Sequence, residues 1–64
     1  MIRLNTHAAM HYVMAKHGLT KYSIATQVGA APASAYQWAK STRMSEHFAR
    51  KFERVFDVYI TDRC

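Results

Sequence analysis

The chain has one cysteine, one proline, two glycines and no long apolar run. A single thiol cannot form an internal disulfide, so nothing in the cysteine content indicates an oxidising compartment. We expect Cys64, the last residue, to be an inert thiol on a frayed end rather than a catalytic or interchain one. His7, His11 and Lys16 interrupt the N-terminal apolar segment before it reaches the length of a signal peptide or a membrane span. The expected protein is therefore soluble and cytoplasmic, without a membrane partner.

Acidic residues are scarce as well. Four Asp and Glu stand against nine Lys and Arg, which gives a formal net charge of +5 and favours polyanionic partners. This charge does not choose between DNA, RNA and an anionic membrane. The sequence also lacks a Gly-rich phosphate loop and a Cys/His cluster, and Ser23, Ser34 and Ser41 lack the flanking glycines of a nucleophile elbow. We therefore expect a protein that is not an enzyme and needs no cofactor or small-molecule ligand.

What the chain does contain is enough apolar material to fold. Half of its 64 residues are hydrophobic, which is too rich for a disordered tail. A chain of this length has room for one domain, expected over residues 1–64, and buries only ~60% of the surface that it exposes when unfolded. Such a domain is marginally stable, so an oligomer is a reasonable expectation.

The N-terminal segment predicts one amphipathic helix. The first few residues are expected to form an arm or a lead-in, Asn5 or Thr6 can cap the helix, and Gly18 stops it. His7 and His11 lie four residues apart, a spacing that can bind zinc, but no Glu stands beside the first His and no clear third ligand follows. We expect two exposed imidazoles and no metal.

The stretch from residue 20 to residue 38 holds two short helices joined by a sharp break. Thr20 can cap a helix over residues 21–28, and Gly29 supplies the left-handed conformation that ends it. Pro32 is tolerated in the first turn of a second helix, where its missing N–H would have no partner. Ala25 is expected where the two helices approach most closely. The small and apolar residues that would close a core between the helices are Ile24, Ala25, Val28, Ala30, Ala35 and Trp38.

This stretch resembles the helix-turn-helix of Cro and repressor-type regulators of bacteria and phages, above all small Cro proteins and YdaS-like regulators. Their second helices often read Val-Thr-Pro-x-x-Val-x-Gln-Trp, where this chain reads Ala30-Ala31-Pro32-Ala33-Ser34-Ala35-Tyr36-Gln37-Trp38. Ala31 replaces the usual Ser or Thr cap, and Ala35 replaces a larger aliphatic residue. The resemblance implies a mainly all-α fold: a lambda-repressor/Cro-like helix-turn-helix bundle of four to five short helices, with the motif at residues 20–39.

The resemblance also implies which residues contact DNA, because the second helix of the motif enters the major groove. If Ala35 and Trp38 face inward, helical spacing places the reading positions on the opposite face, where Gln37 can bond an adenine edge. The residues expected to contact bases are Pro32, Ala33, Tyr36 and Gln37. Those expected to contact the DNA backbone are Lys21, Tyr22, Ser34, Lys40, Ser41, Thr42 and Arg43. For the charged members, the alternative is a solvated side chain.

Beyond the motif, the sequence predicts a loop and a further helix. Residues 39–43 are expected to form a short polar loop. Ser45 can then cap a helix in which Phe48, Phe52 and Phe56 recur every four residues and make one apolar stripe. That spacing is typical of a strongly amphipathic helix.

The last segment, residues 57–62, is β-branched and alternates, as in a short strand. A lone strand has no partner inside the chain. It would pair with its equivalent in a second copy, forming a homodimer through residues 55–61, or it would lie extended over the core. The sequence does not decide between these.

These features lead to two hypotheses about function. The first is a sequence-specific regulator that binds double-stranded DNA as a dimer on a palindromic operator, in the manner of a phage or prophage Cro-like repressor. The second is a small protein-binding module, such as an antitoxin or phage inhibitor, because Ala31, Pro32, Ala33 and Ala35 leave the second helix poor in hydrogen-bonding side chains. A cationic membrane-surface helix fits least well, since the amphipathic segments need one another.

Overall fold

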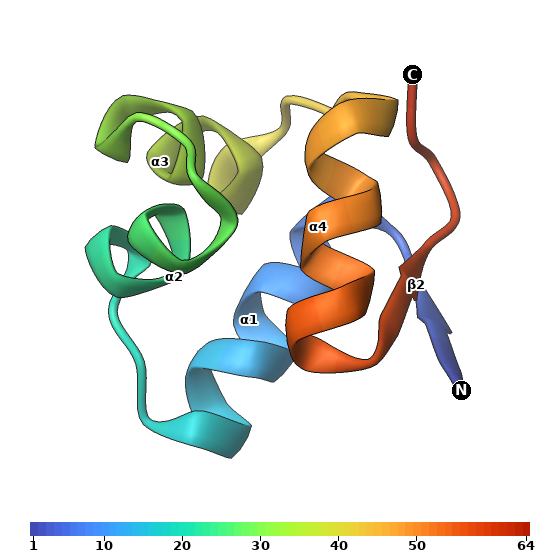
Figure 1. Cartoon of the computed structure of the whole chain (residues 1–64), viewed down its shortest axis with the longest axis horizontal. Helices are drawn as coiled ribbons and strands as arrows, with labels where there is room; N and C mark the ends of the chain where they lie inside the picture. The colour runs from blue at the N-terminus through green and yellow to red at the C-terminus, as the bar shows by residue number, and fades with distance from the viewer.

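The computed structural model describes all 64 residues and shows a small, mostly helical domain with a short parallel sheet (Figure 1). The elements, in chain order, are β1 (Ile2–Leu4), α1 (Thr6–His17), α2 (Lys21–Val28), α3 (Pro32–Lys40), α4 (Glu46–Phe56) and β2 (Val58–Ile60). The helix count agrees with the lower end of the predicted range. None of the four helices is long and apolar enough to span a bilayer.

Local signals set the ends of α1 as the sequence predicts. The Asn5 side chain accepts a hydrogen bond from the Ala8 N–H at 2.8 Å, which satisfies one of the free donors at the start of the helix. Gly18 ends it in the left-handed conformation with φ 65°, and its N–H donates to the Met14 carbonyl. The helix buries Ala9, Met10 and Val13 and exposes both of its first two histidines.

One core joins all six elements. Phe52 of α4 is fully buried in this core, and the centroids of the Phe52 and Phe56 rings lie 4.9 Å apart. The predicted apolar stripe of α4 is therefore confirmed. Met44, in the linker before α4, is fully buried as well. Ser45 stands at the N-cap position, but its side chain makes no capping hydrogen bond, so the expected cap is not formed.

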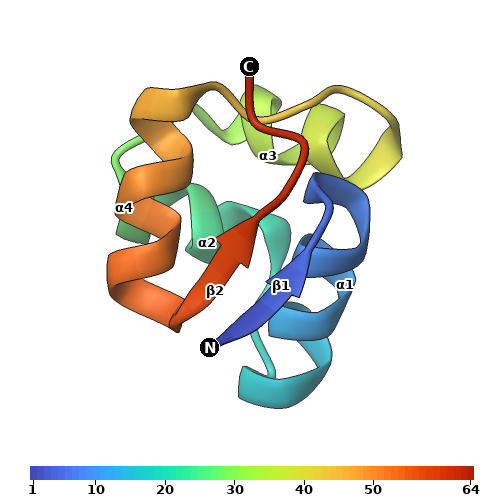
Figure 2. The same cartoon turned by 90° about the vertical axis from the view of Figure 1, so that its right-hand side faces the viewer.

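The C-terminal strand exists, but the prediction that it lacks a partner in the chain is wrong. β2 pairs in parallel with β1, in the register Ile2↔Val58, Arg3↔Tyr59 and Leu4↔Ile60. Figure 2 shows the two strands side by side and pointing the same way. The first residues are therefore a strand rather than an arm. Burial supplies the physical reason, because Val58 and Ile60 are enclosed by the core that α4 and β1 complete.

A buried threonine ties this sheet to the rest of the molecule. The Thr6 hydroxyl donates to Asp62 Oδ1 at 2.8 Å and accepts from the Met44 N–H at 2.9 Å. The Thr6 N–H donates to the same Asp62 oxygen. Cys64 continues the arrangement: its N–H donates to the Met44 carbonyl at 3.0 Å, and its carbonyl accepts from the Glu46 N–H. The expectation of a frayed end is therefore wrong, although the Cys64 residue itself is exposed.

Arg63 attaches the residues after β2 to α4. Its guanidinium donates to Glu46 at 3.0 Å, to Glu53 at 3.2 Å and to the Ile60 carbonyl at 3.0 Å. It also lies over the Tyr59 ring, 4.2 Å from the centroid. These contacts occupy the carbonyl of a β2 residue and hold the chain after β2 against α4.

Candidate nucleic-acid interface

The helices α2 and α3 pack against each other at the side of the molecule opposite the sheet (Figure 1). Thr20 caps α2 by accepting the Ser23 N–H at 3.1 Å. Gly29 ends α2 with φ 75°, and the next N–H, that of Ala30, donates to the Ala25 carbonyl at 2.8 Å. Ala25 is fully buried, as expected for a position of close approach. The turn therefore fixes the angle at which α3 leaves α2.

The helix α3 begins at Pro32 and has the predicted phase. Ala35 and Trp38 are buried, and the Trp38 ring lies 5.6 Å from that of Phe48 on α4. Ala31 stands at the N-cap position without a side-chain bond, as its chemistry requires. The helix continues through Lys40, one residue beyond the end of the motif expected at residues 20–39. The predicted loop therefore starts two residues too early.

Ala39 explains that difference. It is only 7% exposed, so it belongs to the core and not to a polar loop. The Ala39 carbonyl lies 3.4 Å from His11 Nε2 on α1, where the two helices pack together. The burial of the Ala39 side chain against α1 thus favours a helical conformation for Ala39 and Lys40, the last two residues of α3.

The outer face of α3 carries the residues expected to read DNA. Ala33, Tyr36, Gln37 and Lys40 are all exposed, and together they line one shallow open hollow. A second hollow lies beside it, and Gln37 and Ala33 border both. Gln37 is therefore at the middle of this face. Whether these side chains touch bases stays a prediction.

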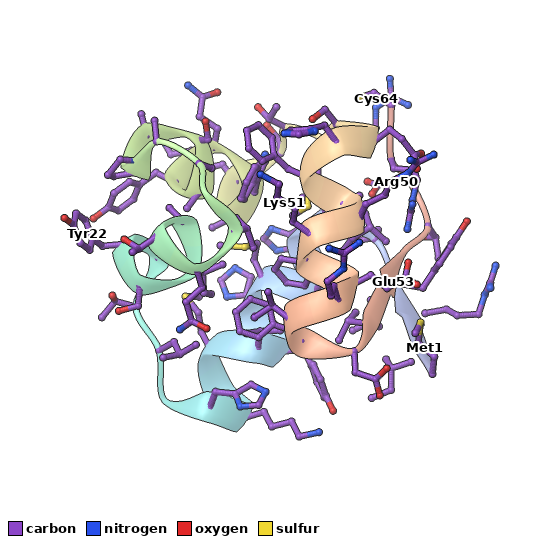
Figure 3. The ribbon with its side chains drawn as sticks, in the orientation of Figure 1. Met1, Tyr22, Arg50, Lys51, Glu53 and Cys64 are labelled. Atoms are coloured by element: carbon purple, nitrogen blue, oxygen red, sulfur yellow. The ribbon has the colours of Figure 1, made fainter.

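Lys21 and Tyr22 extend this face onto α2. Lys21 Nζ lies 5.5 Å from the centroid of the Tyr36 ring, which joins the first turn of α2 to the middle of α3. Tyr22 is 60% exposed and Tyr36 52% exposed. Figure 3 shows Tyr22 at the far side of the molecule from Met1 and Cys64. The face thus combines cationic, aromatic and hydrogen-bonding groups away from the sheet.

The remaining expected backbone contacts lie around this face. Pro32, Ser41 and Arg43 are exposed, and Ser34 is partly buried at the start of α3. Thr42 is exposed too, but its hydroxyl donates to Gln37 Oε1 at 3.1 Å. No local sequence pattern predicts this bond, because it depends on how the chain turns back after α3.

Charge is distributed unevenly along the chain. No acidic residue precedes Glu46, so residues 1–45 hold the whole net charge of +5. Residues 46–64 hold four basic and four acidic side chains, which cancel. The basic residues of the first part are Arg3, Lys16, Lys21, Lys40 and Arg43. Three of these five lie on α2, on α3 or in the loop that follows α3.

On the neutral part, Glu46 and Glu53 form ion pairs with Arg50 and Arg63. Hydrogen bonds from the Arg50 and Arg63 side chains hold the pKa of Glu46 below its ordinary value. Lys51 lies elsewhere on α4, and its Nζ would be 3.5 Å from a Cβ placed at Gly29, close to the C-terminal end of α2 (Figure 3). A cation at that end interacts favourably with the helix dipole.

The structure contains no cluster of three or more His, Cys, Asp and Glu side chains that could hold a metal ion. The His7 and His11 rings contact each other, with centroids 4.5 Å apart, but no third ligand lies near. Comparison with protein-family models, with curated proteins and with solved structures finds no match to this chain.

Proposed function

We propose that this protein is a sequence-specific regulator that binds double-stranded DNA, with α2 and α3 acting as a helix-turn-helix and α3 entering the major groove. The observation that carries the proposal is the outer face of α3, where Ala33, Tyr36, Gln37 and Lys40 are exposed together. An amide, a hydroxyl and a methyl group on one helical face are the groups that read base edges. The resemblance of residues 20–39 to Cro-like regulators supports the same proposal.

The charge distribution supports it independently. Lys21, Lys40 and Arg43 place positive charge beside the reading face, and no carboxylate lies on α1, α2 or α3 to oppose a phosphate. A carboxylate near the DNA backbone would repel the phosphates, so the absence of carboxylates from these helices also favours binding. In this proposal Lys21, Tyr22 and the first turn of α2 contact phosphates on one side of the groove, and Lys40 to Arg43 contact phosphates beyond the end of α3.

We further propose that two copies bind one palindromic operator, with the two α3 helices about 34 Å apart, one turn of the duplex. A single helix of nine residues reads too few base pairs for useful specificity. The strand pairing of β2 with β1 occupies one edge of the segment at residues 55–61, and Arg63 occupies the Ile60 carbonyl. A dimer would therefore have to form through groups other than that paired edge and the Ile60 carbonyl. Binding of one protein chain per duplex would contradict the proposed dimer.

The test is a selection of bound sequences from random duplexes, followed by a salt titration on the selected sequence. Six or more phosphate contacts should weaken binding by about three decades or more between 50 and 200 mM salt. Lys40→Ala should weaken binding to every sequence alike and lower the salt slope by about one. Lys16→Ala is the matched control, because Lys16 is an exposed lysine on α1 and should change the slope little. A flat salt response would contradict the proposal.

One observation favours a second candidate, a protein-binding module. Ala31, Pro32 and Ala33 are all exposed at the start of α3, and Tyr22 and Tyr36 are exposed as well. An aromatic and small-residue surface of this kind also suits a protein partner. Binding through it would hardly change with salt, so the same titration separates the two candidates.

A further inference from the structure

Thr42 contacts Gln37 at two points. Its hydroxyl donates to Gln37 Oε1 at 3.1 Å, and its N–H donates to the Gln37 carbonyl at 3.0 Å. The Ser41 N–H donates to the same carbonyl at 3.1 Å. The chain therefore turns back after α3 in a way that places the Thr42 hydroxyl beside a side chain five residues earlier.

The bond restricts a side chain that is otherwise free. Gln37 is exposed at the middle of the reading face, and an exposed glutamine samples many rotamers. With Oε1 bonded to Thr42, the amide keeps both of its N–H donors and one lone pair on Oε1 for a ligand. Gln37 borders the hollow with Thr42 on one side and the hollow with Tyr36 and Lys40 on the other, so the amide stands between them.

We propose that Thr42 is a positioning residue that holds the Gln37 amide ready to read an adenine, an inference that rests on the proposed DNA-binding function. Adenine offers the N7 acceptor and the N6 donor in the major groove, which match one amide N–H and the remaining Oε1 lone pair. Guanine offers two acceptors there. The held Oε1 would face one of them, so guanine is disfavoured while the Thr42 bond lasts.

This role differs from a phosphate contact by Thr42, which the sequence alone favoured. A phosphate contact adds the same binding energy on every sequence. A positioning role changes the preference only at the base pair that Gln37 reads. A hydrogen bond of this kind contributes on the order of a three- to tenfold effect.

The experiment measures affinity of the full chain for the selected operator and its single-base variants at fixed salt. Thr42→Val keeps the shape and removes the hydroxyl, Thr42→Ser keeps the hydroxyl, and Gln37→Ala locates the base pair. Thr42→Val should lower the preference for adenine at that pair about three- to tenfold and leave the other pairs unchanged. Thr42→Ser should retain the preference, and Thr42→Val should add nothing to Gln37→Ala. Thr61→Val, at an exposed threonine beside the sheet, is the control.

Equal weakening of all duplexes by Thr42→Val would overturn the inference and make the hydroxyl a phosphate contact. A guanine preference in the unchanged protein would overturn it also. NMR relaxation of the Gln37 side-chain amide tests the positioning step without DNA: the amide should become more mobile in Thr42→Val and not in Thr42→Ser or Thr61→Val. If the amide becomes more mobile in Thr42→Val but no duplex binds the protein, the proposed function fails and the positioning contact stands. If DNA binds but the amide does not become more mobile in Thr42→Val, the positioning inference fails and the proposed function stands.

Discussion

Thr6 is the one polar residue fully enclosed in the core, and three segments of the chain meet at it. Its hydroxyl is the only hydrogen-bond partner that the structure gives the Met44 N–H, and it donates at the same time to Asp62. Thr6→Val keeps the shape but leaves a buried N–H unsatisfied, which costs about 1–3 kcal/mol. Chemical denaturation measures the loss. Thr6→Ser, which retains the hydroxyl, should lose less stability than Thr6→Val, and equal losses would mean that packing and not hydrogen bonding dominates.

Trp38 is the largest side chain between α3 and α4. It is 4% exposed and packs beside Phe48, so its removal leaves a cavity that a small domain cannot refill. We expect Trp38→Ala to lose about 3–5 kcal/mol, close to the whole stability of a domain this size. Thermal unfolding followed by circular dichroism is the measurement. An unchanged midpoint together with lost DNA binding would show that Trp38 acts on DNA directly.

At the scale of elements, the turn between α2 and α3 depends on one glycine. Gly29 has φ 75°, a region that costs an L-residue with a Cβ roughly 1–2 kcal/mol. A Cβ there would only touch Lys51 Nζ at an ordinary 3.5 Å, so the cost is in the backbone. Gly29→Ala should therefore lower the free energy of unfolding by about 1–2 kcal/mol, and Gly29→Asn by less, because Asn tolerates this conformation. Equal stability of all three chains would rule out backbone strain at the turn.

The elements differ in how far the sequence could predict them. Caps and stops are local, so Asn5, Gly18, Thr20 and Gly29 act as predicted. The phase of α3 follows from inward and outward positions a few residues apart, and it too is as predicted. The strand β1 has three residues and no turn beside it, so no local pattern distinguishes it from an arm.

The partners of the missed contacts lie far apart along the chain. Thr6 and Asp62 are 56 residues apart, and Arg63 reaches back 17 residues to Glu46. No spacing rule relates such positions, because only the tertiary packing of the chain brings them together. The Thr42 bond to Gln37 is shorter in range, but it needs the turn after α3 to be known first. The sequence could therefore predict which residues lie on the outer face of α3 but not the contact that holds the Gln37 side chain.

At the scale of the whole molecule, Glu46 on α4 contributes a pH-dependent part of the stability. Hydrogen bonds from Arg50 and then Arg63 lower the pKa of Glu46, so the folded state favours its ionised form. The resulting stability is fully present above the ordinary value of 4.5 and is lost as pH falls through the lowered pKa of the folded state. Glu46→Gln removes this contribution at every pH. Denaturation from pH 7 downward should show the unchanged chain and the variant converging in acid, whereas a constant gap would mean that Glu46 acts through packing.

The parallel pairing of β1 with β2 also decides how the protein bears a pulling force. Met1 precedes β1 and Cys64 follows β2, and Figure 2 shows the two chain ends at opposite ends of the sheet. Tension applied between them drags one strand along the other, which loads the ladder hydrogen bonds together instead of opening them one at a time. The bond from the Thr61 N–H to the Leu4 carbonyl shares this load. The contacts of Arg63 and Cys64 with Glu46 and Met44 take up part of the same tension, and the four helices, which lie between the strands along the chain, unravel only after the sheet has sheared.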